Sequence, residues 1–515
     1  GVIQFDQAHL SFPGALQKPA GQPAALEFDA TIGQDRSLRV SRVDIIMPPV
    51  RLSGRGTVRF EPALRVDGSL IAGPIPLSGL PAGMVLGGFD SGTLEISLDL
   101  KGRGADWKRW TLLGWIALTD GRFPSRAGRT VTDIYLRAQL LKNGADVKRL
   151  EFRIDDSSVR MAGTIRDWRT KPVVSATIES PFLDVDLLIP KGERSPVRDF
   201  LEELAATSRV TASVDVTRGR YKQLTLSELT ARLAISDEIV EVSRLGGQIE
   251  EGTLSESRLL VHLPRRKPAE GEVKIQLTGF PSEKAFLLLG DEQRVIAGDL
   301  TLTAALQGNG KNPHGVSDTL NGSVSFRIDQ GRIEKGTIVP KILMMLDIPN
   351  RLQGKIDLNK EGMPFESFSG SMTIENGIVT TKNLLIDSPV LKISGAGSYA
   401  IPADQLNLAV VISPFGSYTK LLQGIPLFGR LLAGERKGFT TAFFDVQGSL
   451  KDPQVISRPL KSVGAGLTGL GQLAFDVLRN TLMLPAEIFA PSEDKPAASA
   501  PPAPPATSQI GRAHV

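Results

Sequence analysis

Cysteine is absent from the 515-residue sequence, and histidine occurs only four times. A chain without cysteine forms no disulfide, no cysteine-ligated zinc site and no iron–sulfur cluster, and it has no cysteine nucleophile. The histidines, His9, His262, His314 and His514, lie far apart, and none has a companion at the spacing that metal ligands need. The patterns HExxH, GxSxG and GxxxxGK[ST] are missing as well. We therefore predict a protein that is not an enzyme, with no catalytic residues, no metal and no cofactor.

Long apolar runs and a strong net charge are also missing. No run of about 18 uninterrupted apolar residues exists, so the sequence predicts no transmembrane helix. The net charge of +4 and the lack of known nucleic-acid-binding motifs argue against nucleic acid as a partner. The chain starts as Gly1-Val2-Ile3, already strand-like and without methionine or a signal sequence. Such a start indicates a fragment whose targeting segment is missing.

Strict alternation of apolar and polar residues dominates the sequence. In 94–100, leucine or isoleucine alternates with Glu95, Ser97 and Asp99, and 210–216 repeats the pattern with valine and alanine. Further stretches of this kind are 273–277, 300–306, 324–328 and 406–412. Alternation puts apolar groups on one sheet face and polar groups on the other. Parallel strands buried on both faces have continuous apolar runs instead, so we predict an antiparallel sheet.

A loose repeat accompanies the alternation. The segments "LLGWIALTDGRF", "LNGSVSFRIDQGRI" and "FSGSMTIENGIV" each contain a glycine, an alternating strand, an Asn, Asp or Gln, and a second glycine. Dipeptides such as Asn376-Gly377 and Asp120-Gly121 are typical of hairpins, although Gly121 and Gly377 can also break a strand before the chain re-enters the sheet. The spacing between the copies is irregular, which indicates a repeated device and not a fixed-period solenoid.

Helical signals are few. Ser195-Pro196 is typical of a helix start and predicts a helix in "SPVRDFLEELAAT". The segments "SEKAFLLL" from Ser282 and "VPKILMML" from Val339 predict two shorter helices, and 462–484 is the longest candidate. We divide the chain into a first β segment at 1–194, a helix plus middle β segment at 195–295, a C-terminal β region with terminal helices at 296–490, and a Pro/Ala-rich disordered tail at 491–515 whose last residues resemble a translated sequencing adapter.

The sequence raises the question of what covers the apolar face of so many strands. A second sheet or helices would cover it in an ordinary sandwich. The predicted helices are too few for this, and aromatic residues, at 6%, are scarce for a thick core. A long sheet curled into a trough would share its apolar interior with something other than protein, and acyl chains suit such an aliphatic lining. A closed core and an open groove remain the two alternatives, and we favour the groove.

A carbohydrate-active enzyme is a third interpretation. It would need clustered carboxylates and aromatic platforms. Three of the four tryptophans, Trp107, Trp110 and Trp115, lie close together in the sequence, apart from Trp168. This spacing is more typical of a strand or loop cluster than of a sugar platform.

The C-terminal region resembles the AsmA-like family of envelope proteins. The resemblance is carried by "FSGSMTIENGIV" from Phe368, "LLIDSPVLKISGAGSYAIPADQLNLAVVISP" from Leu384, "FFDVQGSLKDPQV" from Phe443 and "TLMLPAEIF" from Thr481. It covers 298–489, and the upstream sequence is compatible with it through the same strand pattern. The resemblance implies a long twisted β-groove of the bridge-like lipid-transfer type. It also implies an inner-membrane anchor, formed by an N-terminal helix that this fragment lacks, and a span across the periplasm toward the outer membrane.

We predict a mainly β fold: a long twisted antiparallel sheet curled into an open groove, with a few short helices and a C-terminal helix. The predicted function is a non-enzymatic conduit that binds and transfers phospholipid across the periplasm and so contributes to outer-membrane lipid homeostasis and assembly. The predicted partners are phospholipid acyl chains and the inner and outer membranes. The alternative is an assembly factor or scaffold for outer-membrane proteins, as in TamB-like proteins, whose exposed strand edges would pair with client strands.

Two sets of residues carry this prediction. The period-two phase of the strands predicts one shared interior, because a slip of one residue would reverse every side chain. The residues predicted to line the groove are Val324, Phe326, Ile328, Met372, Ile374, Leu391, Ile393, Leu406, Leu408 and Val410. The residues of the C-terminal helix predicted to contact the membrane are Leu470, Phe475, Leu478 and Leu482.

Overall fold

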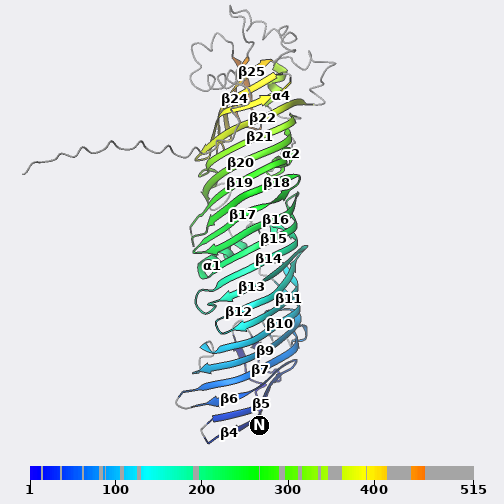
Figure 1. Ribbon diagram of the computed structural model, residues 1–515, viewed down its shortest axis with the longest axis vertical. Helices are drawn as coiled ribbons and strands as arrows, with labels where there is room; N and C mark the ends of the chain where they lie inside the picture. Colours follow the sequence, from blue (N-terminus) through cyan, green and yellow to red (C-terminus); the bar gives the residue numbers. More distant parts are fainter. Residues whose placement is uncertain are drawn as a thin grey trace, which may run out of the picture.

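Most strands of the chain join into one long sheet, as the computed structural model shows (Figure 1). The structure describes residues 1–458 except 13–15, 35–36, 61–62, 81–84, 87, 105–108, 125–128, 189–195, 266, 289–295, 311–315, 334–337, 346–361, 390 and 415–441. In this part of the chain, 24 strands belong to the main sheet and three short strands form a second sheet.

The N-terminal part of the chain supplies the first strands of the main sheet and all of the second sheet. In the main sheet these are β1 (Val2–Gln4), β4 (Ala25–Ile32), β5 (Ser37–Met47), β6 (Val50–Arg59), β7 (Arg65–Pro76), β9 (Ser91–Arg103), β10 (Thr111–Pro124), β11 (Thr130–Leu141), β12 (Gly144–Ile154), β13 (Ser157–Arg166) and β14 (Val173–Asp184). The second sheet contains β2 (Leu10–Phe12), β3 (Leu16–Lys18) and β8 (Val85–Leu86), and the described 3-10 helices of this part include η1 (Leu77–Gly79) and η3 (Val185–Leu187).

The rest of the described chain continues the main sheet and includes the helices α1, α2 and α4. The strands are β15 (Arg209–Tyr221), β16 (Leu224–Ser236), β17 (Ile239–Ile249), β18 (Gly252–His262), β19 (Ala269–Pro281), β20 (Ile296–Gly310), β21 (Asn321–Ile333), β22 (Met363–Glu375), β23 (Ile378–Asp387), β24 (Leu391–Ala400), β25 (Gln405–Pro414), β26 (Ala442–Gly448) and β27 (Gln454–Arg458). The helices are α1 (Pro196–Thr207), α2 (Ser282–Leu288) and α4 (Ile338–Met345).

Neighbours in the main sheet follow the order of the chain. Pairing runs from β1 through β4, β5, β6, β7 and β9 to β10, and then strand by strand to β27. These pairs are antiparallel except β14 and β15, which are parallel and have α1 in the connection between them. A parallel pair requires the chain to return to the same end of the sheet, and the segment that contains α1 makes this return. Figure 1 shows the strands crossing the long axis obliquely and stacking from β4 near the N-terminus to β25.

Bulges inside strands keep the apolar face on one side of the sheet. Asp120 has a φ of 52°, and the register between β10 and β11 shifts between Leu118 and Gly121. A bulge adds one residue to one strand, bends that strand and increases its right-handed twist. Leu118 and Gly121 therefore share a face although three positions separate them. Comparable positive φ values inside strands occur at Asp133, Glu228, Arg244, Glu256 and Gln330.

The dipeptides of the repeated segment make two different structures. Asp120-Gly121 lies inside β10 and breaks its alternation. Asn376-Gly377 joins β22 to β23, with φ values of 49° and 75°. Two consecutive positive φ values are the geometry of a two-residue hairpin, and an Asn-Gly pair adopts them at low cost. The Asn376 N–H also donates to Oδ1 of Asn321 at 3.0 Å, which fixes the hairpin to the start of β21.

Helix α1 covers one margin of the apolar face of the sheet. Ala205 is fully buried and packs in one cluster with Ile235, Val240 and Leu263. Ile235 and Val240 are directly opposite each other on β16 and β17. The helix that returns the chain for the parallel pair therefore also covers part of the apolar face.

Helices α2 and α4 are each fixed to the sheet by a lysine. In α2, the Lys284 ammonium donates to Glu250 at the end of β17. Burial opposes ionisation of Glu250, yet the hydrogen bonds from Lys284 and from the Thr225 N–H outweigh it and lower the pKa of this carboxyl. In α4, Lys341 Nζ donates to Asp452 Oδ1 at 2.8 Å, beside the start of β27.

The predicted fold class is confirmed: the chain is mainly β, with one large open sheet and few helices. The helices predicted in the segments after Ser195, from Ser282 and from Val339 correspond to α1, α2 and α4. The helix predicted at 462–484 and the tail at 491–515 lie outside the described residues. The division of the chain at 194 and at 295 stays a prediction; strand pairing continues past both positions, between β14 and β15 and between β19 and β20.

Replacing Gly114 should loosen the sheet locally. Its φ is +137°, and an added Cβ would collide with the Ser97 carbonyl of β9. We expect Gly114→Ala to lower the opening free energy of β9 and β10 by about 1–3 kcal/mol, measured by hydrogen exchange. Gly271→Ala in β19 is the matched control, because a Cβ there meets no atom within 4 Å. An equal loss of protection in both variants would contradict the close approach at Gly114.

Candidate functional site

One unbroken row of apolar residues crosses the sheet from β1 to β26. Each member lies directly opposite the next in the pairing register, so all of them project from the same face. Every member is Gly, Ala, Val, Leu, Ile or Tyr, and none carries a charge. This inner row consists of Ile3, Leu26, Ile45, Leu52, Ala72, Ile96, Ile116, Ala138, Val147, Gly163, Ala176, Ala212, Leu233, Val242, Leu259, Val273, Leu306, Gly322, Ile374, Val379, Tyr399, Leu406 and Gly448.

The row of residues one position away projects from the opposite face and is mostly polar. Ile71 and Trp115 are among its apolar members, and they leave 57% and 37% of their surface exposed. From β4 to β21 this outer row contains Glu27, Asp44, Ser53, Ile71, Ser97, Trp115, Gln139, Asp146, Thr164, Ser175, Thr211, Ala234, Glu241, Leu260, Glu272, Gln307 and Asn321. The sheet therefore has one apolar face and one face suited to water along this length.

The apolar face is hollow near the N-terminal end and partly accessible in the middle. Residues of β1, β4, β5, β6, β7 and β9 line a mainly apolar cavity of about 400 Å³ there, with Leu26, Phe28 and Leu100 among its walls. In the middle of the sheet Leu259, a member of the inner row on β18, leaves 39% of its surface exposed. An apolar side chain held on a concave face but still exposed offers contact surface to a ligand.

The C-terminal end of the apolar face is packed instead. Ile342 of α4 is fully buried in a large apolar cluster that includes residues of β16 and of β18 to β26. Phe326 and Phe368 meet edge to face in this cluster, with ring centroids 5.0 Å apart. At the N-terminal end the apolar face is thus part hollow and part packed, since Ala72 of the inner row is buried in a cluster with Leu77, whereas Ile342 of α4 covers it at the C-terminal end.

Tyr399 is the one member of the inner row with a polar side-chain atom, and that atom already has a partner. Its hydroxyl donates to Asp404 Oδ1 at 3.0 Å, while Asp404 also accepts from Ser449 Oγ at 2.5 Å and from the Leu450 N–H at 3.1 Å. Burial and the hydrogen bond to Asp404 raise the pKa of Tyr399, so the phenol stays neutral. The inner row consequently presents no unpaired polar group of its own at this end.

The structure places the ten residues predicted to line the groove on the inner face. Val324 is opposite Met372, and Leu406 and Ile374 belong to the inner row itself. In the large cluster, Ile328, Leu391, Ile393, Leu406 and Val410 are buried, and Phe326 and Leu408 pack against them. Ile374 is also buried, and Val324 and Met372 are half-buried. The role of these residues as a lipid lining stays a prediction.

Sequence reasoning missed the N-terminal half of the inner row and the apolar cavity there. Ile96, Ala212 and Val273 lie in stretches whose alternation is visible in the sequence. What the sequence could not supply was the register that aligns them with each other. The residues predicted to contact the membrane, Leu470, Phe475, Leu478 and Leu482, lie outside the described part of the chain.

Neither a metal site nor a membrane-spanning helix occurs among the residues that the structure describes. Among them, no group of three or more His, Asp or Glu side chains is arranged to hold a metal ion. No helix formed by these residues is long and apolar enough to cross a membrane.

Comparison with protein-family models matches residues 95–455 to the family described as "YhdP protein". The match covers more than half of the chain and begins well upstream of 298–489, where the sequence resemblance was recognised. It includes the strands from β10 to β26 and therefore most of the inner row. A search of curated proteins finds no match.

Asp404→Asn should remove a pH-dependent contribution to the stability of the C-terminal end of the sheet. Hydrogen bonds from Ser449 and from the Leu450 N–H lower the pKa of Asp404 from its ordinary value of 3.8. A carboxylate of this kind stabilises the fold above its unfolded-state pKa, and the contribution is lost as the pH falls through the folded-state pKa. We expect the variant to have the lower thermal midpoint at neutral pH and to match the wild type in strong acid. Ser449→Ala should show the same trend, and a difference that stays constant with pH would contradict it.

Proposed function

The chain belongs to the YhdP family, part of the AsmA-like family of bridge-like lipid transporters, and from this premise we propose that it is a non-enzymatic conduit for phospholipids. In this proposal the acyl chains lie along the inner row and the headgroups stay in water at the ends of the strands. The single observation that supports it is the inner row itself, which continues from β1 to β26 without a charged side chain.

The hydrophobic effect supplies the affinity. Moving one methylene group from water to an apolar surface yields about 0.8 kcal/mol, so a two-chain lipid strongly prefers the inner face to water. A charged side chain on that face would have to lose water as an acyl chain passed it, which is costly. A continuous apolar row therefore matters more for a conduit than for a protein that only binds lipid at one place.

The same row permits movement. Its members are small or aliphatic apart from Tyr399, so a sliding acyl chain exchanges one apolar contact for a similar one. Neighbouring strands lie about 4.8 Å apart, and 24 strands at this spacing extend on the order of 100 Å. A path of this length, with small free-energy differences between neighbouring positions, suits transfer between two membranes.

The proposed setting is the bacterial cell envelope, where proteins of the family act. The sheet would bridge the periplasm and pass phospholipid from the inner membrane toward the outer membrane. The alternative function, assembly of outer-membrane proteins, would use strand edges and not the inner face, and it stays a prediction. Substitutions confined to one face therefore distinguish the two functions.

A charge on the inner row should block lipid transfer. Val242 lies between Leu233 and Leu259 in the inner row, where the sheet is partly accessible. We expect Val242→Glu to slow the transfer of labelled phospholipid between donor and acceptor vesicles by roughly tenfold or more, because the carboxylate must lose water as a chain passes.

The neighbouring residue provides a matched control. Ser243 projects from the outer face opposite Arg232, so Ser243→Glu adds the same charge where it is solvated and attracted. This control should transfer lipid as the wild type does, and circular dichroism should show both variants folded. Equal transfer by the two variants would reject the inner face as the path.

The absence of cysteine allows the predicted lining to be mapped directly. Met372→Cys on the inner face and Thr373→Cys on the outer face are adjacent in β22. A phospholipid with a thiol-reactive group on its acyl chain should label Met372→Cys several-fold faster than Thr373→Cys, because apolar chains reside on the apolar face. Faster labelling of Thr373→Cys would show that the assigned face is wrong.

A further inference from the structure

Three glycines on neighbouring strands face inward near the N-terminal end of the sheet. Gly54 of β6 lies two positions from Leu52 of the inner row and therefore on the same face. Gly56 of β6 and Gly68 of β7 are directly opposite each other, and a Cβ on Gly56 would lie 2.6 Å from the Asp67 carbonyl oxygen. The two backbones approach too closely for a larger residue, so the inner face has no side chains at these positions.

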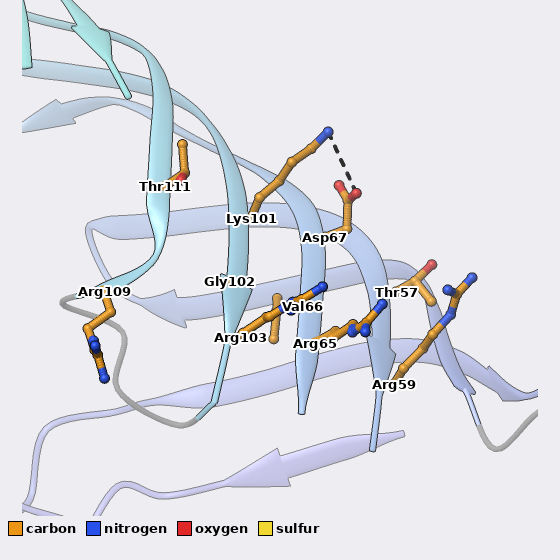
Figure 2. Close-up of a pocket in the computed structure, with 10 residues that line it drawn as sticks. All are labelled: Thr57, Arg59, Arg65, Val66, Asp67, Lys101, Gly102, Arg103, Arg109 and Thr111. Carbon is orange, nitrogen blue, oxygen red and sulfur yellow. Dashed lines mark ion pairs between the residues drawn. The ribbon is translucent and has the colours of Figure 1, made fainter. Parts of the chain in front are cut away.

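The apolar cavity of about 400 Å³ lies over these glycines, and apolar side chains form its walls. The inward-facing walls include Phe28, Val40, Val43, Val58, Val66 and Leu70. Arg55, Thr57 and Asp67 border the same cavity, but they alternate with the glycines and valines and so project from the outer face. Asp67 is paired on that face with Lys101, 3.7 Å away (Figure 2). A ligand in the cavity consequently meets hydrocarbon side chains from these walls.

The chain closes the cavity on the side of the inner row. Leu77 of η1 is buried in one cluster with Ala72 of the inner row. Leu52 of the inner row packs against this cluster, and so do Phe5 and Leu10 from the N-terminal segment. A chain-like ligand that enters the cavity therefore meets packed protein on this side, which limits the length that the cavity can hold.

The volume of the cavity fits one acyl chain. An apolar protein cavity of ~150 Å³ holds one benzene molecule, so about 400 Å³ holds roughly sixteen carbon atoms at the same density. We propose that the cavity binds a single acyl chain of a membrane lipid, up to about sixteen carbon atoms long. This inference rests on the proposed function, and it adds a defined site, the number of chains that the site takes and a limit on their length.

The fixed volume makes the site selective for chain length. Each methylene group that enters the cavity leaves water, so affinity should increase severalfold with each added pair of carbon atoms. Once the cavity is full, further methylene groups stay outside it and add little. A uniform apolar row sets no such limit, and this difference separates the cavity from the remainder of the inner face.

The absence of cysteine allows a single introduced thiol to report on the cavity. Ala30 of β4 lines the cavity, and the next residue, Thr31, is exposed on the outer face. We expect monomeric lysophosphatidylcholine, added to the full 515-residue chain, to protect Ala30→Cys from iodoacetamide. Protection should tighten as the acyl chain lengthens to about sixteen carbons and then stay constant. Thr31→Cys should react at the same rate throughout.

A larger wall residue should lower this length limit. Val58→Phe fills the volume of about four carbon atoms, so in the Ala30→Cys background the limit should fall to about twelve carbons. Val2→Phe is the matched control, because Val2 lies opposite Glu27 on the outer face and is 65% exposed. Its limit should stay at about sixteen carbons. Val40→Phe serves as a second wall variant, and circular dichroism identifies the variants that fold.

The remaining outcomes would overturn either the proposal or its premise. If lipid does not protect Ala30→Cys while the acyl probe still labels Met372→Cys, this site is wrong and the proposed function stands; if both fail, the proposed function fails. An unchanged limit in folded Val58→Phe would reject the cavity as the site. A limit of about eight carbons would mean that two chains share it. A thiol that is unreactive without lipid would show that the chain itself fills the cavity, and protection that grows with protein concentration alone would show a second copy there.

Discussion

The in-register pairing of pleated strands is the constraint on which the rest of the molecule depends. Side chains alternate between the two faces, and a slip of one residue would move a whole strand's apolar set to the wrong face. The apolar residues stay on the inner face even where a bulge or the parallel pair interrupts the regular antiparallel pattern. The bulge between Leu118 and Gly121 leaves both on the inner side, and the parallel step still sets Ala176 beside Ala212. The inner row is the cumulative product of these local registers.

A sheet built in this way has no single core. Strands contact mainly the next strand in the chain, as repeat proteins do, so stability comes from many nearest-neighbour interfaces. Apolar clusters occur near both ends and under α1, while Leu259 in the middle remains partly exposed. On the proposed function this separates two requirements: the fold tolerates local damage to the inner face, whereas a conduit fails wherever its row is interrupted.

Much of the fold follows from local pattern, and the remainder depends on pairing over long distances in the sequence. The alternation at 94–100 and at 324–328 predicts strands with one apolar face. The ten predicted lining residues share a face, as the apolar/polar alternation of their strands indicates. The bulges at Glu228 and Arg244 could not be predicted, since charged residues with positive φ inside a strand leave no apolar signal in the sequence. The parallel pair was missed as well, because the α1 segment gives no sign of which end of the sheet it returns to.

The candidate site, too, could be predicted only in part from the sequence. The apolar character of each strand can be predicted from its own sequence, whereas Leu52, Ala72 and Ile96 become neighbours only through the pairing of three strands. Likewise, 111 positions separate Lys341 from its partner Asp452. Sequence periodicity identifies what a strand can offer to each face; it does not identify which distant residue will lie beside it.

The two ends of the inner face differ in a way that bears on transport. A uniform apolar row has no preferred direction, because each step exchanges like contacts for like. On the proposed function, any directional bias would therefore arise where the row changes: at the N-terminal hollow, and at the C-terminal cluster where Ile342 occupies the inner face. On the proposed function, an acyl chain would enter the N-terminal hollow lined by Leu26 and Phe28, and it would follow the row through the C-terminal cluster only if α4 moved away from the inner face. The interactions of α4, and not those of the long middle of the sheet, would then limit passage at that end.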